Sequence, residues 1–264
     1  MTPDTDPTSG HPDRLRAAFT TQSVTMEDAA LGMAFTAGLD WLVDVIQPRA
    51  DDLAVDLAGG TGLVARHLAG RVRSIVVVDV TEAMLRAGRR AAAAAGLATV
   101  GFVCGDATGS PLPSAAFSLA VSRFAMHHVP DPGALFDELL RLTRPGGRIV
   151  VKDLVAADDE TVAQRHDALE ILRDDSHLLM LRPGEAARAL IARGATVTRV
   201  ARRDLDRPLE PWLEQARTPA GRADQVRRAL EEELGGGPPT GLRPHRRDGQ
   251  LWFRHAWEAT AATR

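Results

Sequence analysis

Two hydrophobic patterns alternate between residues 53 and 154. Short, continuously apolar runs, typical of buried strands, occur at 53–57, 75–78, 100–103, 117–121 and 148–154. Stretches with helical spacing of apolar residues lie between them, and two carry start signals, Thr81 before 82–95 and Asp131-Pro132 before 133–142. Alternating strands and helices predict an α/β fold with a parallel sheet and helices on both faces.

The pattern changes on either side of this region. Residues 1–13 are rich in Thr, Pro and Asp, and we expect a disordered tail there. Helical runs then precede the first strand, at 14–20 and 26–46. After residue 154 the chain shows helical runs at 161–179, 183–194 and 210–234, the last broken near Pro219, and strand-like runs at 195–204 and 251–259.

The first strand ends in the sharpest break of the pattern. It contains Asp56 and gives way to Ala58, Gly59, Gly60, Thr61 and Gly62, after which a helical run begins at Leu63. Glycine lets the backbone approach a ligand closely, and a helix start presents N–H groups without partners. A plain strand-to-helix turn is the simplest interpretation, but the glycines favour a cofactor site.

Two cofactors fit this loop. Residues 60–65 match the dinucleotide fingerprint G-x-G-x-x-[GA], and Asp79 ends the next strand, where a ribose-binding acid is expected. A carboxylate at Asp56 instead suits a ligand with a sulfonium and an ammonium group, S-adenosylmethionine (SAM), and is poorly placed beside a pyrophosphate.

The segments downstream favour SAM. Asp56–Gly62, Asp79, Gly105-Asp106-Ala107 and Ser122–Val129 occur in an order that resembles the class I SAM-dependent methyltransferases, with Ala58 in place of the usual first glycine. The resemblance is strongest to the branch of ubiquinone and menaquinone C-methyltransferases and natural-product methyltransferases. It implies a Rossmann-like, seven-stranded, mostly parallel sheet with a late antiparallel strand and helical lid elements.

This resemblance also implies a domain plan and a set of cofactor contacts. One domain over 14–264 would comprise N-terminal lid helices (14–50), a cofactor-binding core (53–154) and cap or substrate elements (155–194 and 206–249). Asp79 would accept hydrogen bonds from the ribose hydroxyls, and Asp106 from the adenine amino group. The implied contacts to SAM, or to the product S-adenosylhomocysteine, are Asp56, Ala58, Gly59, Gly60, Gly62, Asp79, Val80, Met84, Gly105, Asp106, Ala107, Ser122, Arg123 and Phe124.

Histidines are the candidates for acceptor chemistry. Methyl transfer to a hydroxyl or carbon requires a base, and His127 and His128 follow the fourth strand at the ligand-binding edge. His166 and His177 are eleven residues apart, about three helical turns, and could share a face with Arg173 between them. Taken alone, each histidine is more simply explained by a structural role, a cofactor contact or an exposed polar face, and the spacing predicts no metal site. The expected substrate contacts are Phe19, Arg173 and His177, with Gln22 and Ser23 as further lid contacts.

Composition narrows the function further. The single cysteine, Cys104, excludes an intrachain disulfide, and the net charge of −3 argues against a nucleic-acid partner. No apolar run approaches the ~20 residues of a membrane span, and the N-terminus lacks a signal-peptide core, so a cytoplasmic protein is expected. We predict methyl transfer from SAM to a small apolar or aromatic secondary metabolite. The alternatives are a non-methylating reaction such as cyclisation, or a SAM-binding accessory protein, and a homodimer is left open.

Overall fold

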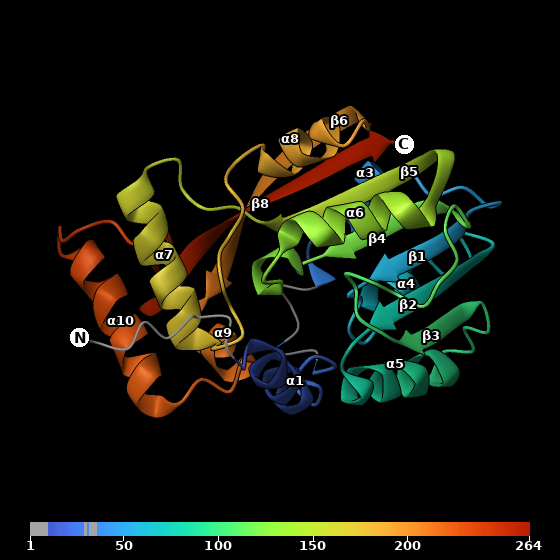
Figure 1. The fold of residues 1–264 in the computed structure, drawn as a ribbon. Helices are drawn as coiled ribbons and strands as arrows, with labels where there is room; N and C mark the ends of the chain where they lie inside the picture. Colours follow the sequence, from blue (N-terminus) through green and yellow to red (C-terminus); the bar gives the residue numbers. More distant parts are fainter. Residues whose placement is uncertain (1–9, 29–30, 32–35) are drawn as a thin grey trace.

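A mixed β-sheet crosses the middle of the protein, which is described here by a computed structural model for residues 10–28, 31 and 36–264 (Figure 1). Within these residues the strand order is β3-β2-β1-β4-β5-β8-β6, with the short β7 paired to β8. Five parallel strands form one part: β1 (Leu53–Leu57), β2 (Ser74–Asp79), β3 (Val100–Cys104), β4 (Phe117–Arg123) and β5 (Thr143–Leu154). The other strands are antiparallel: β6 (Thr196–Pro208), β7 (His245–Arg247) and β8 (Gln250–Thr263). The predicted Rossmann-like fold with late antiparallel strands is confirmed.

Helices cover both faces of this sheet. One face packs against α3 (Leu39–Ile46), α4 (Leu63–Leu68) and α5 (Glu82–Ala94), and the other against α6 (Pro132–Leu142) and α8 (Glu185–Ala192). Alternate residues of β1 separate the two cores, with Val55 and Leu57 facing α6 and Ala54 facing α3 and α4. The central strands β1, β4 and β5 are therefore buried on both sides, whereas the edge strand β3 is only half-buried.

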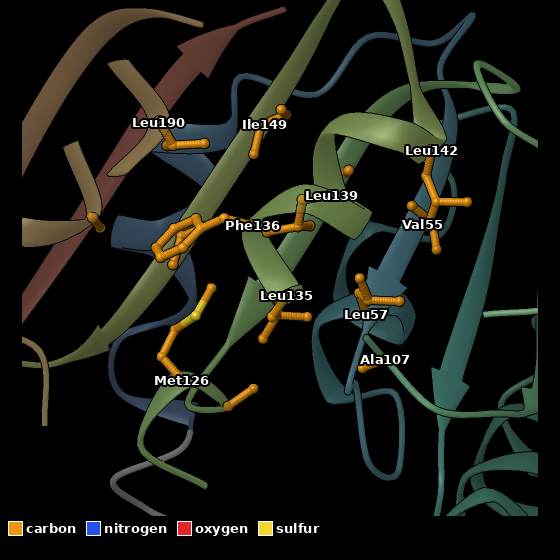
Figure 2. Packing of buried hydrophobic residues seen from close by; sticks show 14 of the residues in the cluster. Val55, Leu57, Ala107, Met126, Leu135, Phe136, Leu139, Leu142, Ile149 and Leu190 are labelled. Atoms are coloured by element: carbon orange, nitrogen blue, oxygen red, sulfur yellow. The ribbon is translucent and has the colours of Figure 1, made fainter. Parts of the chain in front are cut away.

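Figure 2 shows the core beneath α6. Leu135, Phe136, Leu139 and Leu142 project from this helix toward the strands, and each is at most 2% exposed. Their spacing of one, three and three residues places them on one helical face. Burying each such side chain contributes about 1.5–3 kcal/mol, so α6 fixes the end of β4 from which the histidine pair emerges.

The second half of the chain builds a cap beyond the sheet. The cap consists of α7 (Glu160–Arg173), α9 (Leu209–Gln215), α10 (Ala220–Leu234) and the first part of β8 (Figure 1). Its separate core contains Leu169, Trp212, Val226, Leu230 and Phe253. The long strands β6 and β8 connect this cap to the sheet, because β8 pairs with both β5 and β6.

Three expectations about the helices need correction. Helix α1 (His11–Gln22) begins inside the segment 1–13 expected as a tail, since Pro12 fits a first helical turn; residues 1–9 lie outside the described part. The run 26–46 is not one helix: residues 23–27 form turns, α3 begins at Leu39, and 29–30 and 32–35 are not described.

The run 161–179 is also shorter than expected, because α7 ends at Arg173. Asp174 is extended there, and its carboxylate accepts a hydrogen bond from the backbone N–H of Ser176, which stabilises a turn in place of the helix. His166 and His177 therefore do not share a helical face. In the part of the chain that is described, no helix is long and apolar enough to span a bilayer.

Candidate active site

The glycine loop after β1 has a backbone that few side chains would permit. Gly60 and Gly62 have φ of +58° and +71°, in the left-handed region that favours glycine. A Cβ at Gly62 would lie 2.9 Å from the Val77 side chain. Ala58 adopts φ of +55° with a side chain, at a cost of about 1–2 kcal/mol. The backbone is strained here because alanine stands in place of the usual first glycine.

Asp79 ties the loop to the end of β2. Its Oδ2 accepts a hydrogen bond from Gly60 N at 2.8 Å, and its Oδ1 accepts one from Thr81 N at 2.8 Å. Burial raises the pKa of Asp79, while these two donors oppose the rise. Each carboxylate oxygen can accept a second hydrogen bond, so Asp79 remains able to receive ribose hydroxyls. Thr81 begins α5 as expected, although its side chain makes no capping bond.

A cavity of about 380 Å³ opens above this loop, at the carboxyl ends of the parallel strands. It gathers most of the predicted cofactor residues and two predicted for the acceptor, Phe19 and His128. The predicted cofactor residues along its wall are Ala58, Gly59, Gly60, Asp79, Val80, Met84, Asp106, Ala107, Arg123 and Phe124. Asp56, Gly62, Gly105 and Ser122 are not among the lining residues, and neither are His127, His166, His177 and Arg173.

One wall of the cavity comes from α1. His11, Leu15 and Phe19 line it at four-residue spacing, together with Pro12 and Arg16. This spacing puts them on one helical face, a signal that was readable from the sequence. Val129 and Pro130 extend the wall beyond the histidine pair. The part of the cavity that remains for a methyl acceptor is therefore lined mostly by apolar side chains.

Two further acids near the loop are placed differently from each other. Asp56 lies beneath the loop, where its Oδ2 accepts a hydrogen bond from Ala65 N at 3.3 Å. Burial raises the pKa of Asp56 to about 7, with Arg123 opposing the rise. Asp106 faces the cavity, and its Oδ1 accepts from both Thr108 N (2.8 Å) and Thr108 Oγ1 (2.7 Å). Oδ2 of Asp106 is thus the oxygen suited to an adenine amino group.

His127 is a buried partner of Asp153. Its Nδ1 lies 2.5 Å from Asp153 Oδ1, and Asp153 Oδ2 accepts from Met126 N at 2.7 Å. Burial opposes protonation of His127, but the neighbouring Asp153 carboxylate outweighs it and raises the histidine pKa. The pair anchors the turn after β4 outside the cavity wall.

His128 has the opposite environment. It lines the cavity, its ring meets Phe19 edge-on at 4.9 Å, and its Nδ1 lies 3.0 Å from the carbonyl oxygen of Ser176. A carbonyl can only accept, so Nδ1 carries the hydrogen and Nε2 keeps the lone pair. Burial and the nearby His127 lower the pKa of His128, which keeps the ring neutral. Of the two adjacent histidines, His127 is therefore bonded within the protein and His128 faces the cavity.

The cap contains a buried group that superficially resembles a metal site. His166, Glu170 and His255 bring potential ligand atoms within 4.8 Å of one another. However, Arg207 Nη1 lies 3.3 Å from His255 Nδ1 and must be the donor, so His255 Nε2 carries a hydrogen, which it donates to Glu170 Oε1 at 2.8 Å. Metal-binding histidines instead donate to an acceptor behind them. The chemistry of this set fits a hydrogen-bonded ion cluster better than a metal.

Comparisons with known proteins agree with this geometry. A family described as a methyltransferase domain matches residues 55–151. The uncharacterized methyltransferase YcgJ of Bacillus subtilis is 26% identical over 188 residues, 71% of this chain and 74% of that protein. The demethylmenaquinone methyltransferase of Clavibacter sepedonicus is 40% identical over 106 residues, but this match spans only 42% of that protein and 40% of this chain.

Solved structures show the same fold over a larger part of the chain. The YcgJ structure has a TM-score of 0.77 at 22% identity and covers 86% of this chain and 98% of its own. The [4+2]-cyclase SpnF has a TM-score of 0.61 at 17% identity and covers 85% of this chain and 79% of its own. At these identities the likeness concerns fold alone. The matched family covers residues 55–151, and over this region the chain has the cofactor-binding core of a class I SAM-dependent methyltransferase.

Proposed function

We propose that this protein methylates a hydroxyl or activated carbon of a small apolar or aromatic metabolite, with His128 as the base. The observation that carries this proposal is the position of His128. It lines the same cavity as the glycine loop and Asp79, and its Nδ1 is bonded to the protein behind it. Its lone-pair nitrogen, Nε2, is then the one available to an acceptor.

The cofactor residues fit SAM in an ordered way. Asp79 at the end of β2 suits the ribose hydroxyls, and Asp106 after β3 suits the adenine amino group. The backbone N–H groups of the loop and the buried carboxylate of Asp56 suit the amino-acid portion and its positive charge. SAM supplies a methyl group already activated by the adjacent sulfonium.

The chain's own residues then position the acceptor and remove its proton. The apolar side chains of Leu15, Phe19 and Val129 exclude water and hold an apolar acceptor against His128. As the acceptor oxygen or carbon bonds to the methyl carbon, the carbon–sulfur electron pair stays on sulfur and the acceptor proton passes to His128 Nε2. The products are the methylated acceptor, S-adenosylhomocysteine and a protonated histidine, which returns its proton to solvent.

The quinone relatives support an aromatic acceptor. The demethylmenaquinone methyltransferase that resembles residues of this core acts, by its name, on a quinone. Since that match spans under half of both chains, the acceptor class rests equally on the apolar wall of the cavity. We therefore place reduced quinones and phenols first among the acceptors.

The test is binding followed by a substrate screen. Calorimetry of the purified protein should show SAM and S-adenosylhomocysteine binding and no tight binding of NAD. Methyl-labelled SAM is then incubated with the protein and a panel of hydroquinones, phenols and isoprenoid alcohols. We expect label in an extracted acceptor in amounts equal to the S-adenosylhomocysteine formed. Tight NAD binding without SAM binding, or an acceptor transformed without gaining label, would contradict the proposal, and the latter outcome would favour a cyclisation-type reaction.

A further inference from the structure

A turn outside the cavity supports His128 from behind. Asp174 ends α7, and its Oδ1 accepts hydrogen bonds from Ser176 N at 3.0 Å and from Ser176 Oγ at 2.6 Å. Both residues are almost fully buried, with 5% of Asp174 and 0% of Ser176 exposed. The turn therefore holds the backbone carbonyl and the hydroxyl of Ser176 in defined directions.

These two groups both face Nδ1 of His128. The Ser176 carbonyl oxygen lies 3.0 Å from Nδ1, and Ser176 Oγ lies 3.1 Å from it. The hydroxyl hydrogen is used toward the Asp174 carboxylate, so Oγ meets Nδ1 as an acceptor. Two acceptors in front of Nδ1 favour the tautomer with hydrogen on Nδ1. Neutral imidazole has one N–H, which leaves Nε2 as the basic nitrogen.

Helix α1 contacts the same arrangement through three residues. Gln22 Nε2 donates to Asp174 Oδ2 at 2.7 Å, and His11 Nε2 donates to the backbone oxygen of His128 at 2.7 Å. Phe19 packs edge-on against the His128 ring. Residues 11, 19 and 22 are eight and three positions apart, so they occupy one face of α1, the face that also walls the cavity.

We infer that Asp174 and Ser176 are positioning residues, which hold His128 with Nδ1 protonated and Nε2 directed to the methyl acceptor. Gln22 links this arrangement to the wall that α1 provides. The inference rests on the proposed role of His128, but its physical content is a tautomer that can be observed without an acceptor. When His128 takes a proton at Nε2, the Asp174 carboxylate stabilises the resulting charge through Ser176.

A purely structural turn would have a different signature. It would contribute to folding, but the ratio of the two His128 tautomers would then be the ratio of a histidine ring in water. The positioning role instead requires that the tautomer depend on the two acceptors. That dependence is measurable by long-range proton–nitrogen NMR of the full-length protein labelled with ¹⁵N-histidine and saturated with S-adenosylhomocysteine, with His128→Gln used to assign the signals.

In the wild type we expect His128 with protonated Nδ1 and unprotonated Nε2. Ser176→Ala removes one acceptor, and Asp174→Ala releases the turn, so both variants should show a mixture of tautomers. Asp175→Asn is the matched control, since this neighbouring carboxylate is half exposed and its ion pair with Arg222 is long, at 3.9 Å. It should leave the His128 signals unchanged.

Protonated Nε2 in the wild type would overturn the inference even if Asp174→Ala failed to fold. An unchanged tautomer in the milder Ser176→Ala variant together with an unchanged one in folded Asp174→Ala would overturn it as well. Failure of the proposed function has a separate signature, the absence of methyl transfer in the acceptor screen, which leaves the tautomer measurement unaffected.

Discussion

The carboxyl group of Asp56 lies directly beneath the backbone of Gly59. A Cβ built on Gly59 would fall 2.7 Å from Asp56 Cγ and 2.9 Å from the Val77 side chain. Contacts this short require neighbouring atoms to move, and Asp56 is buried with little room. The glycine at this position is therefore explained by the acid three residues earlier, and the two act as one unit beneath the cofactor cavity.

Gly59→Ala should damage both the fold and the cofactor site. We expect a loss of about 1–3 kcal/mol of unfolding free energy from overpacking, and SAM binding weakened by displacement of the loop. Thermal melting and calorimetry measure the two effects. Gly221→Ala is the control, because nothing lies within 4 Å of a Cβ there and it sits in α10, where alanine is favourable. Equal behaviour of the two variants would show that the contact with Asp56 is relaxed in solution.

SAM affinity should increase with pH through neutrality. A cationic ligand favours ionised Asp56, and burial raises the pKa of this carboxyl to about 7. Between about pH 6 and about pH 8 the association constant should therefore rise, by at most about tenfold per unit on the acidic side, with proton release on binding. Calorimetry in buffers of different ionisation enthalpy measures both quantities. An affinity that does not change over this pH range would mean that the charge of Asp56 does not contribute to SAM binding.

The same carboxyl gives the ligand-free protein an opposite pH dependence. Its pKa rises from an ordinary value of 3.8, which applies to the unfolded chain, to about 7 in the folded protein, so the folded state binds more protons in this interval. The Asp56 contribution to stability is therefore lost as pH rises from about 4 to about 7. Asp56→Asn should flatten this part of the stability curve while weakening SAM binding. Denaturant unfolding at several pH values measures the free energy of unfolding of both proteins. If it changes with pH equally in the wild type and in the variant, Asp56 is not the group responsible.

Asp79→Ala should reduce SAM binding more than stability. The carboxylate accepts from Gly60 N and Thr81 N, and it is the group suited to the ribose hydroxyls. Charged hydrogen bonds of this kind contribute about 1.5–3 kcal/mol, which corresponds to roughly a tenfold to hundredfold weaker complex. Glu82→Ala, an exposed change in the first turn of α5, is a suitable control. Tight SAM binding by Asp79→Ala would remove this residue from the cofactor site.

Chelation should leave the cap unchanged. Arg207 faces His255 Nδ1, and the other ring nitrogen of His255 donates to Glu170, so both nitrogens of His255 are already used within the protein. His166 lies 3.7 Å from the same Glu170 carboxylate. We expect purified protein without stoichiometric transition metal and an unchanged melting temperature after EDTA treatment. Metal content near one equivalent that disappears in Glu170→Gln would mean that His255 does not donate from Nε2 to Glu170.

The local pattern predicted the central sheet well, and the structure brings many of the residues predicted for the cofactor to one cavity. Strong strand runs and the Asp56–Gly62 loop depend on near neighbours, so their structure follows from periodicity and glycine geometry. Ala58, Gly60, Asp79, Asp106 and Phe124 line one cavity because each follows the carboxyl end of a parallel strand or starts the next helix. Asp56, which was expected to contact SAM directly, lies beneath the loop and is not among the lining residues of the cavity.

The acceptor side depends on contacts between distant segments and was predicted less well. His127 and His128 look equivalent in sequence, and only Asp153 and Ser176, separated from them by 26 and 48 residues, divide their roles. His166 and His177 diverge because the side chain of Asp174 forms a turn that competes with the helix. Such side-chain competition has no periodic signal along the chain.

The most direct test of the account is the single-turnover rate of methyl transfer in His128→Ala. With SAM bound and a saturating acceptor from the screen, we predict a rate about 10²–10⁴-fold below wild type, as expected for loss of a general base, while SAM affinity is unchanged. His245→Ala, in the short strand β7, should match the wild type. A His128→Ala rate equal to wild type would contradict the assignment of His128 as the base.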